Sequence, residues 1–115
     1  MVVLLDDDDD FRSALAANLA EDGYQVTHFA RPIDVPALGS LERLAVLILD
    51  YNMDGEDGLS FADRFHLTHP RVPVVMLTAY WSTHLEAEIA RRNFIILRRK
   101  PIDYDELARL LPVPS

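Results

Sequence analysis

The sequence predicts an α/β fold in which a five-stranded parallel β-sheet carries helices on both of its faces. Strand-like and helix-like segments alternate five times along the 115 residues, with short loops between them, a pattern typical of parallel sheets. The strand-like segments are also apolar at nearly every position, as expected for strands covered on both sides. A chain of this length, half of it hydrophobic, suits one compact core, so we expect residues 1–115 to form a single domain.

The first strand and helix are marked by a change in the spacing of apolar residues. Residues 2–6 form a continuous apolar run that ends in an acid, as expected of a buried strand. Phe11, Leu15 and Leu19 then repeat every four residues, which indicates a helix with one buried face. We expect this helix to begin near Phe11 and Gly23 to end it.

The next part of the chain predicts two strands and an irregular connection. Residues 24–29 alternate between apolar and polar side chains, like a strand. Residues 31–42 have apolar side chains at roughly helical spacing, but Pro36 would interrupt a helix, so we predict a short or distorted one. Residues 45–50 (AVLILD) form a third strand that is apolar on both faces.

The second half of the chain continues the alternation. In chain order we predict a helix at Gly58–Thr68, a strand at residues 72–78, a helix at residues 82–92, a short strand at residues 94–97 and a last helix that stops before Pro112. Pro73 fits best near the start of its strand. Asp103 with Glu106 three residues later forms a capping box, which marks the start of the last helix.

The composition argues against several kinds of binding surface and metal site. Lys and Arg number 11 against 19 Asp and Glu, a formal charge of -8, which argues against a nucleic-acid surface and against an anionic membrane. The chain has no cysteine, which excludes disulfides and thiolate metal sites. The N-terminus lacks the features of a signal peptide, and no apolar stretch is long enough to span a bilayer. We therefore expect a cytoplasmic protein.

Five consecutive aspartates, residues 6–10, follow directly on the first apolar strand. A run of acids usually indicates a solvated, disordered tail, but this one lies between a predicted strand and a predicted helix. Carboxylates held at a strand end repel one another, and a bound cation is the usual way to keep them together at neutral pH. The junction therefore predicts a site for a hard, oxygen-preferring metal ion.

Polar residues also follow the other predicted strands. Asp6 and Asp7 end the first strand, Asp50 the third and Thr78 the fourth, and Lys100 follows the fifth. In open α/β sheets, ligands bind beyond the carboxyl ends of the strands. Two or three carboxylates can hold Mg²⁺, and a carboxylate can accept a phosphoryl group whose charge then needs a metal, a cation and a hydroxyl donor. The set predicts phosphoryl chemistry.

The chain resembles the receiver domain of two-component response regulators over essentially its whole length. The matching motifs are LLDDDDDF at the first strand exit, LILDYNMDGEDG around Asp50, VVMLTAY around Thr78 and RRKP around Lys100. Each motif alone is weak, but the set in this order is highly specific. The resemblance implies the flavodoxin-like receiver fold, with strand order 2-1-3-4-5.

The resemblance also implies a metal site. Asp50 would be the phosphoacceptor and, with Asp7 and the backbone carbonyl of Asn52, would bind Mg²⁺, while Asp6 would act on the metal through water. We assign the remaining acids, residues 8–10, to solvent and to the start of the helix, where negative charge complements the helix dipole.

Other matching residues would contact the phosphoryl group or shape the backbone around it. Thr78 would donate to a phosphoryl oxygen, and Lys100 would pair with the phosphoryl group, or with Asp50 before phosphorylation. Pro101 matches the family's proline in a cis peptide bond. The pair DG at positions 57 and 58 matches the acid and glycine that open the helix after the acceptor strand.

Three positions bear on switching. Leu97 stands where the family usually has an aromatic switch residue, and Asp54 stands where it usually has proline. Tyr80 falls at a position that, with Asn52, tunes how fast the aspartyl phosphate is lost in the family. Our hypothesis is that Tyr80 hinders the attacking water.

By resemblance, the protein is a phosphorylatable signalling switch that catalyses only its own phosphorylation and slow dephosphorylation. A histidine kinase or a phosphotransfer protein would supply the phosphoryl group. Many receivers dimerise through the face made by helix four, strand five and helix five, and the basic pair Arg98–Arg99 lies there in this chain. The short last helix and its proline-rich end indicate either a trimmed face or a domain cut from a longer response regulator.

Three alternatives remain. Residues 50–55 match the start of an EF-hand calcium loop, but position twelve is Phe61 rather than glutamate. A phosphatase of the haloacid dehalogenase type would need a second aspartate where Asn52 stands. A receiver-like module that binds partners without phosphorylation fits the presence of Leu97 and Asp54.

Overall fold

The computed structural model describes residues 1–53 and 56–114 and contains one five-stranded parallel sheet with the strand order β2-β1-β3-β4-β5. The predicted fold class and strand order are confirmed. The strands are β1 (Val2–Leu5), β2 (Val26–Phe29), β3 (Val46–Asp50), β4 (Val74–Thr78) and β5 (Ile95–Arg99). The α-helices among the described residues are α1 (Asp9–Glu21), α2 (Gly58–Thr68), α3 (Thr83–Ala90) and α4 (Tyr104–Arg109).

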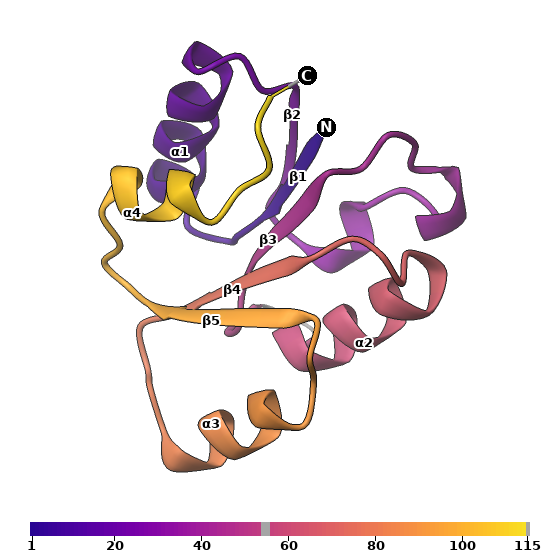
Figure 1. The fold of residues 1–115 in the computed structure, drawn as a ribbon, viewed down its shortest axis with the longest axis vertical. Helices are drawn as coiled ribbons and strands as arrows, with labels where there is room; N and C mark the ends of the chain where they lie inside the picture. Colours follow the sequence, from indigo (N-terminus) through magenta and orange to yellow (C-terminus); the bar gives the residue numbers. More distant parts are fainter. Residues whose placement is uncertain (54–55, 115) are drawn as a thin grey trace.

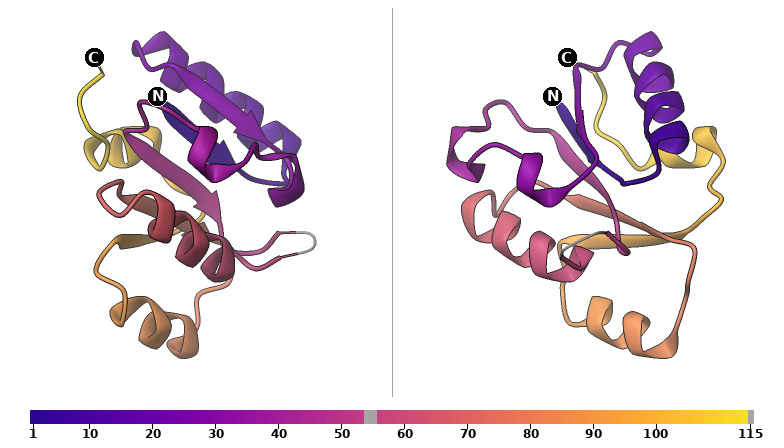
Figure 2. Two further views of the ribbon diagram at one scale, coloured as in Figure 1. Left: turned by 90° about the vertical axis from the view of Figure 1, so that its right-hand side faces the viewer. Right: turned by 180° about the vertical axis from the view of Figure 1, so that it is seen from behind.

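The helices cover both faces of the sheet, as Figures 1 and 2 show. Helices α1 and α4 lie together on one face, and α2 and α3 lie on the other. Successive residues of a strand point to opposite faces, so Val3 and Leu5 of β1 pack toward α2 and α3, while Val2 and Leu4 pack toward α1. The core is therefore divided into two apolar clusters by the sheet. This explains why the central strands are apolar at consecutive positions.

The connection between β2 and β3 differs most from a regular strand–helix repeat. Residues 31–42 contain two 3₁₀ turns, Pro32–Asp34 and Leu38–Ser40, and no α-helix. This agrees with the predicted short or distorted helix, because proline lacks an N–H to donate within a helix and its ring clashes with the preceding turn. The fourth and fifth helices of the sequence prediction are consequently α3 and α4 of the structure.

Several element boundaries differ from the prediction. Helix α1 begins two residues before Phe11, because Asp8 caps it by accepting a hydrogen bond from the backbone N of Phe11 at 3.1 Å. Strand β5 extends to Arg99, beyond the predicted residues 94–97. Asp103 is at the N-cap position of α4, but its side chain makes no capping hydrogen bond, so the predicted capping box is wrong.

The predicted end of α1 is confirmed. Gly23 follows the end of α1 with a φ of 95°, a conformation that glycine adopts without strain. Among the described residues, no helix combines the length and the apolar character needed to cross a bilayer.

Candidate metal centre

The carboxyl ends of β1 and β3 bring three aspartates together. The two strands are parallel neighbours, with Leu5 paired to Leu49, so Asp6 and Asp50 leave the sheet side by side. Oxygen atoms of Asp6, Asp7 and Asp50 all lie within 4.8 Å of one another. Asp6 and Asp50 are buried and Asp7 is exposed. We call these three residues the acidic cluster.

Backbone hydrogen bonds orient the two buried carboxylates of the acidic cluster. Asp6 Oδ1 accepts a hydrogen bond from the backbone N of Asp8 at 2.9 Å, and Asp50 Oδ1 accepts one from the backbone N of Asn52 at 3.3 Å. Arg12 Nη1 donates to the backbone carbonyl of Asp6 at 2.8 Å, which holds the end of β1. Asn52 itself is exposed in the turn after β3.

Lys100 supplies the positive charge nearest to the acidic cluster in the described structure. Its Nζ donates to Asp6 Oδ2 at 2.7 Å and lies 3.6 Å from Asp50 Oδ2. The backbone N of Lys100 donates to the carbonyl of Thr78 at 2.7 Å, and the Lys100–Pro101 peptide bond is cis. One ammonium thus faces two buried carboxylates, Asp6 and Asp50, which leaves this pair with an excess of negative charge.

The environment of Asp50 disfavours its charged form. Burial raises the pKa of the Asp50 carboxyl above its ordinary value, and the charges of Asp6 and Asp7 act in the same direction. The Lys100 ammonium and the Asn52 N–H oppose this increase without cancelling it. A cation bound between these carboxylates would favour the charged form again, because opposite charge lowers the pKa of a carboxyl group.

Thr78 ends β4 next to β3 and is fully buried. Its Oγ1 accepts a hydrogen bond from the backbone N of Tyr80 at 3.0 Å. A hydroxyl that accepts one hydrogen bond still has its own O–H to donate. Thr78 therefore places a possible donor at the same edge of the sheet as the acidic cluster.

The donor set of the acidic cluster fits a hard divalent cation. Three carboxylates from two neighbouring strand ends lie close enough to share one ion, and carboxylate oxygen is the ligand that Mg²⁺ and Ca²⁺ prefer. The buried and oriented carboxylates of Asp6 and Asp50 distinguish this group from exposed surface acids.

Residues 2–111 match the sequence model of the response regulator receiver domain family. The chain belongs to this family. Among curated proteins, it is 30% identical over 111 residues to the DNA-binding transcriptional regulator NtrC of Salmonella typhimurium, covering 96% of this chain and 24% of NtrC. It is 27% identical to the C4-dicarboxylate transport transcriptional regulatory protein DctD of Rhizobium meliloti, covering 94% of this chain and 24% of DctD. The chain thus spans about a quarter of the length of these relatives.

Solved structures agree with this assignment. The chemotaxis protein CheY4 of Vibrio cholerae has a TM-score of 0.82 at 25% identity, covering 95% of this chain and 92% of CheY4. A response regulator protein from Burkholderia pseudomallei, solved with a phosphorylated aspartic acid, calcium ion and citrate, has a TM-score of 0.84 at 21% identity. This second likeness covers 96% of this chain and 65% of that one, and it shows the fold alone.

Helix α2 of the receiver domain packs directly on the end of β3. A Cβ atom on Gly58 would lie 2.8 Å from the backbone O of Asp50 and 2.8 Å from Cα of Tyr51, so only glycine allows this approach. Asp57 caps the helix by accepting from the backbone N of Ser60 at 2.8 Å. The DG pair of the sequence thus positions α2 against the backbone of Asp50.

The positions expected to tune or switch the receiver have distinct surroundings. The Tyr80 side chain is 75% exposed, so it does not pack into the core. Leu97 is buried in the apolar cluster beneath α2 and α3, paired in register with Met76. The guanidinium carbon of Arg99 lies over the Trp81 ring, 4.9 Å from the ring centroid. Asp54 lies outside the described residues.

Two contacts of the site were not expected from the sequence. Lys100 Nζ lies nearest to Asp6 rather than to Asp50, and it also lies 4.3 Å from the ring centroid of Phe11. The helical spacing of Phe11 indicated only a core position. No local pattern relates residue 11 to residue 100, because their proximity depends on where the start of α1 lies relative to the segment after β5.

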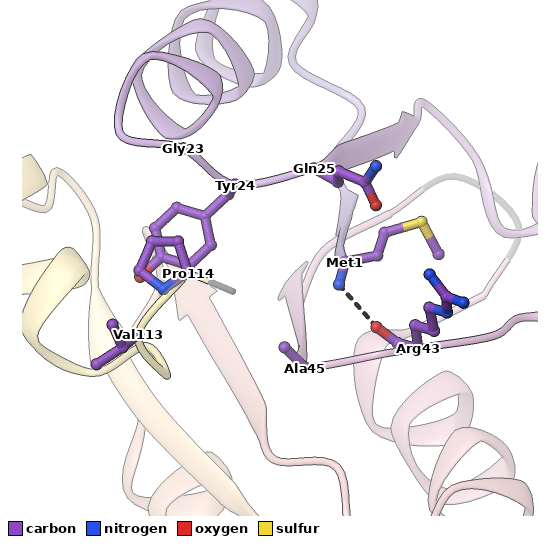
Figure 3. Close-up of a pocket in the computed structure, with 8 residues that line it drawn as sticks. All are labelled: Met1, Gly23, Tyr24, Gln25, Arg43, Ala45, Val113 and Pro114. Atoms are coloured by element: carbon purple, nitrogen blue, oxygen red, sulfur yellow. Dashed lines mark hydrogen bonds between the residues drawn. The ribbon is translucent and has the colours of Figure 1, made fainter.

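A separate cavity of about 270 Å³ lies at the opposite edge of the sheet, where Met1, Gln25 and Ala45 precede three of the strands. Figure 3 shows the amine of Met1 donating to the carbonyl of Arg43, a bond of 2.7 Å. Because it lies at the amino ends of the strands, this cavity is not part of the acidic cluster.

Proposed function

We propose that this chain is a Mg²⁺-dependent phosphoryl acceptor that switches a partner or output surface in two-component signalling. Asp50 is the acceptor, and a histidine kinase or a phosphotransfer protein supplies the phosphoryl group. The observation that carries the proposal is the position of Asp50, which shares the acidic cluster with Asp6 and Asp7 and has Lys100 Nζ 3.6 Å from its carboxylate.

The metal is assigned to residues at the ends of β1 and β3. Asp7, Asp50 and the backbone carbonyl of Asn52 would hold Mg²⁺, and Asp6 would act on it through water. When bound, Mg²⁺ offsets the charges of the carboxylates and of the incoming phosphoryl group. Burial and the acidic neighbours raise the pKa of Asp50, and a cation bound at this site would lower it again.

The transfer itself needs one bond to form and one to break. A carboxylate oxygen of Asp50 attacks phosphorus, and the bond between phosphorus and the donor's imidazole nitrogen breaks with its electron pair on nitrogen. Lys100 pairs with the phosphoryl oxygens, and the Thr78 hydroxyl donates to one of them. Lys100 Nζ already lies 3.6 Å from Asp50 Oδ2, which supports this role.

Residues 1–115 form a single receiver domain in this proposal. It acts in the cytoplasm as a signalling module and not as an enzyme of the usual kind, although it catalyses its own phosphorylation. One similar structure is named adenylate cyclase from Rhodopirellula baltica, but at 22% identity it shows only the fold. NtrC is named as DNA-binding. This acidic chain matches only 24% of NtrC. Any DNA binding would therefore belong to segments other than these 115 residues.

Phosphorylation would shift an existing equilibrium toward an active surface. We place this surface on α3, β5 and α4, which is also the face for a homodimer. Arg98 and Arg99 lie at the end of β5 on this face, with Arg98 Nε 3.8 Å from Glu106. The buried position of Leu97 in β5 makes it a candidate to respond to movement of Thr78.

Intact mass after incubation with Mg²⁺ and acetyl phosphate tests the function. We expect one phosphoryl adduct on the parent protein and none on Asp50→Asn or in EDTA. Asp57→Asn is the matched control, because it removes a nearby carboxylate that caps α2 and lies outside the acidic cluster. If the parent forms no adduct and does not bind beryllofluoride, the chain is instead a phosphorylation-independent interaction module.

A further inference from the structure

Phe11 is the part of the site to which the proposed function assigns no role. Its ring lies on the first turn of α1, and Lys100 Nζ is 4.3 Å from the ring centroid. The face of an aromatic ring attracts a cation at this distance. Lys100 therefore has three attractive neighbours, which are the carboxylates of Asp6 and Asp50 and the ring of Phe11.

The contact between Phe11 and Lys100 is partly shielded from water. The Lys100 side chain is only 15% exposed. Phe11 is partly buried and packs against the apolar cluster beneath α1 and α4. Attraction between a cation and a ring grows when both are desolvated. The backbone N of Phe11 is also the donor in the Asp8 cap, at 3.1 Å, so the start of α1 holds the ring in place.

We propose that Phe11 is a positioning residue that holds the Lys100 ammonium beside Asp50 while Asp6 is engaged with the metal. This inference rests on the proposed function. In the structure the shortest contact of Lys100 is with Asp6, at 2.7 Å. A dication near Asp6 weakens that contact, because the carboxylate then serves two cations and the two cations repel each other.

The ring of Phe11, unlike the carboxylates, has no affinity for Mg²⁺. Hard dications bind oxygen, and a phenyl ring offers none. The ring therefore keeps its attraction for Lys100 when Mg²⁺ binds, whereas Asp6 and Asp50 are both shared with the metal. Lys100 remains oriented toward the place where the phosphoryl oxygens arrive, which reduces the cost of forming that ion pair.

The geometry is tested first by NMR of the parent protein. Protons above the face of an aromatic ring resonate upfield, so we expect the Hε signals of Lys100 to be shifted upfield, and to stay so when Mg²⁺ is added. Phe11→Leu should lose the shift, and Phe11→Tyr, which keeps the ring, should retain it. Loss of the shift in the parent on addition of Mg²⁺ would overturn the proposal, and this outcome requires no variant to fold.

Binding of beryllofluoride at saturating Mg²⁺ tests the consequence. We expect Phe11→Leu to bind it about fivefold more weakly than the parent, which corresponds to about 1 kcal/mol, and Phe11→Tyr to bind within about twofold. Mg²⁺ affinity alone should be nearly unchanged in both variants. Equal binding by the parent and Phe11→Leu, or an equal loss in Phe11→Tyr, would show that the ring is needed only for packing.

Trp81→Leu is the matched control, because it removes a ring from beneath Arg99 instead of Lys100. It should leave the Lys100 Hε shift intact, and loss of the shift here would contradict the assignment to Phe11. A parent that forms no beryllofluoride or phosphoryl adduct contradicts the proposed function. The Hε shift with Mg²⁺ alone then still decides whether Phe11 holds Lys100.

Discussion

Lys100 is bound more closely to Asp6 than to Asp50. Its Nζ lies 2.7 Å from the Asp6 carboxylate and 3.6 Å from that of the proposed acceptor. Asp6 is 1% exposed, so this ion pair is nearly removed from solvent. The lysine thus offsets charge at the end of β1, and a bound cation and an incoming phosphoryl group would change how this charge is shared.

Asp6→Asn should raise the stability of the metal-free protein and weaken its binding of Mg²⁺. In EDTA we expect the variant to be more stable than the parent by about 1 kcal/mol, because Asp6 and Asp50 share one ammonium and removing one of their charges reduces their repulsion. The asparagine oxygen can still accept from Lys100 and from the backbone N of Asp8. Mg²⁺ should stabilise the parent much more than the variant. Urea unfolding with and without Mg²⁺ measures both effects.

Asp10→Asn is the control for this experiment. It removes the same charge from the exposed first turn of α1, outside the acidic cluster. Its stabilisation by Mg²⁺ should match that of the parent. If Asp6→Asn is less stable than Asp10→Asn in EDTA, the ion pair between Asp6 and Lys100 outweighs the repulsion among the carboxylates. The predicted gain in stability would then be wrong.

Gly58→Ala should destabilise the protein by about 1–3 kcal/mol, because the new methyl group meets backbone that cannot move aside easily. The nearest atoms, 2.8 Å away, belong to Asp50 and Tyr51, so we also expect weaker Mg²⁺ binding. Gly39→Ala is the control, since nothing lies within 4 Å of its Cβ position. Similar urea midpoints for the two variants would contradict the close packing of α2 on β3.

The pair Asp63–Arg92 should make stability depend on pH. Hydrogen bonds from Arg92, at 2.8 and 2.9 Å, hold the pKa of the Asp63 carboxyl below its ordinary value of 3.8. A depressed folded pKa means that the stabilisation is present above the unfolded pKa and is lost as pH falls through the folded pKa. Because Asp63 is 46% exposed, we expect Asp63→Asn to cost less than about 1 kcal/mol at neutral pH.

Urea unfolding at neutral pH and below pH 4 checks this prediction, and the difference between parent and variant should shrink in acid. Asp34→Asn is the matched control. It breaks a pair with a single 3.3 Å contact to Arg31, so its effect at neutral pH should be smaller. A difference for Asp63→Asn that stays constant, or that grows as pH falls, would rule out the proposed coupling.

Tyr80→Ala tests whether this side chain slows loss of the phosphoryl group. If Tyr80 hinders the attacking water, dephosphorylation should be roughly threefold faster in the variant, a change of less than 1.4 kcal/mol in the barrier. The ring is 75% exposed, so the variant should fold normally. Leu67→Ala, at an 83% exposed position on α2, is the control. An unchanged rate in Tyr80→Ala would end the hypothesis.

Much of the fold was predictable because the signals are local. Continuous apolar runs mark β1, β3 and β4, and apolar residues at helical spacing mark α1 and α2. The segment 31–42 was only partly predictable, since Pro32 and Pro36 interrupt the helical pattern without specifying the two 3₁₀ turns that replace it. The capping box at Asp103 failed because a favourable residue spacing does not ensure that the side chain makes its hydrogen bond.

The fold class, and the polar residues that leave the carboxyl ends of the strands, were predictable from the sequence, because both depend on the order of residues along the chain. Tertiary structure decided which of these residues touch. The register of β1 against β3 places Asp6 beside Asp50, and the packing of α1 near the end of β5 brings Phe11 beneath Lys100. Such contacts join residues far apart in sequence, and their distances depend on the packing of whole elements.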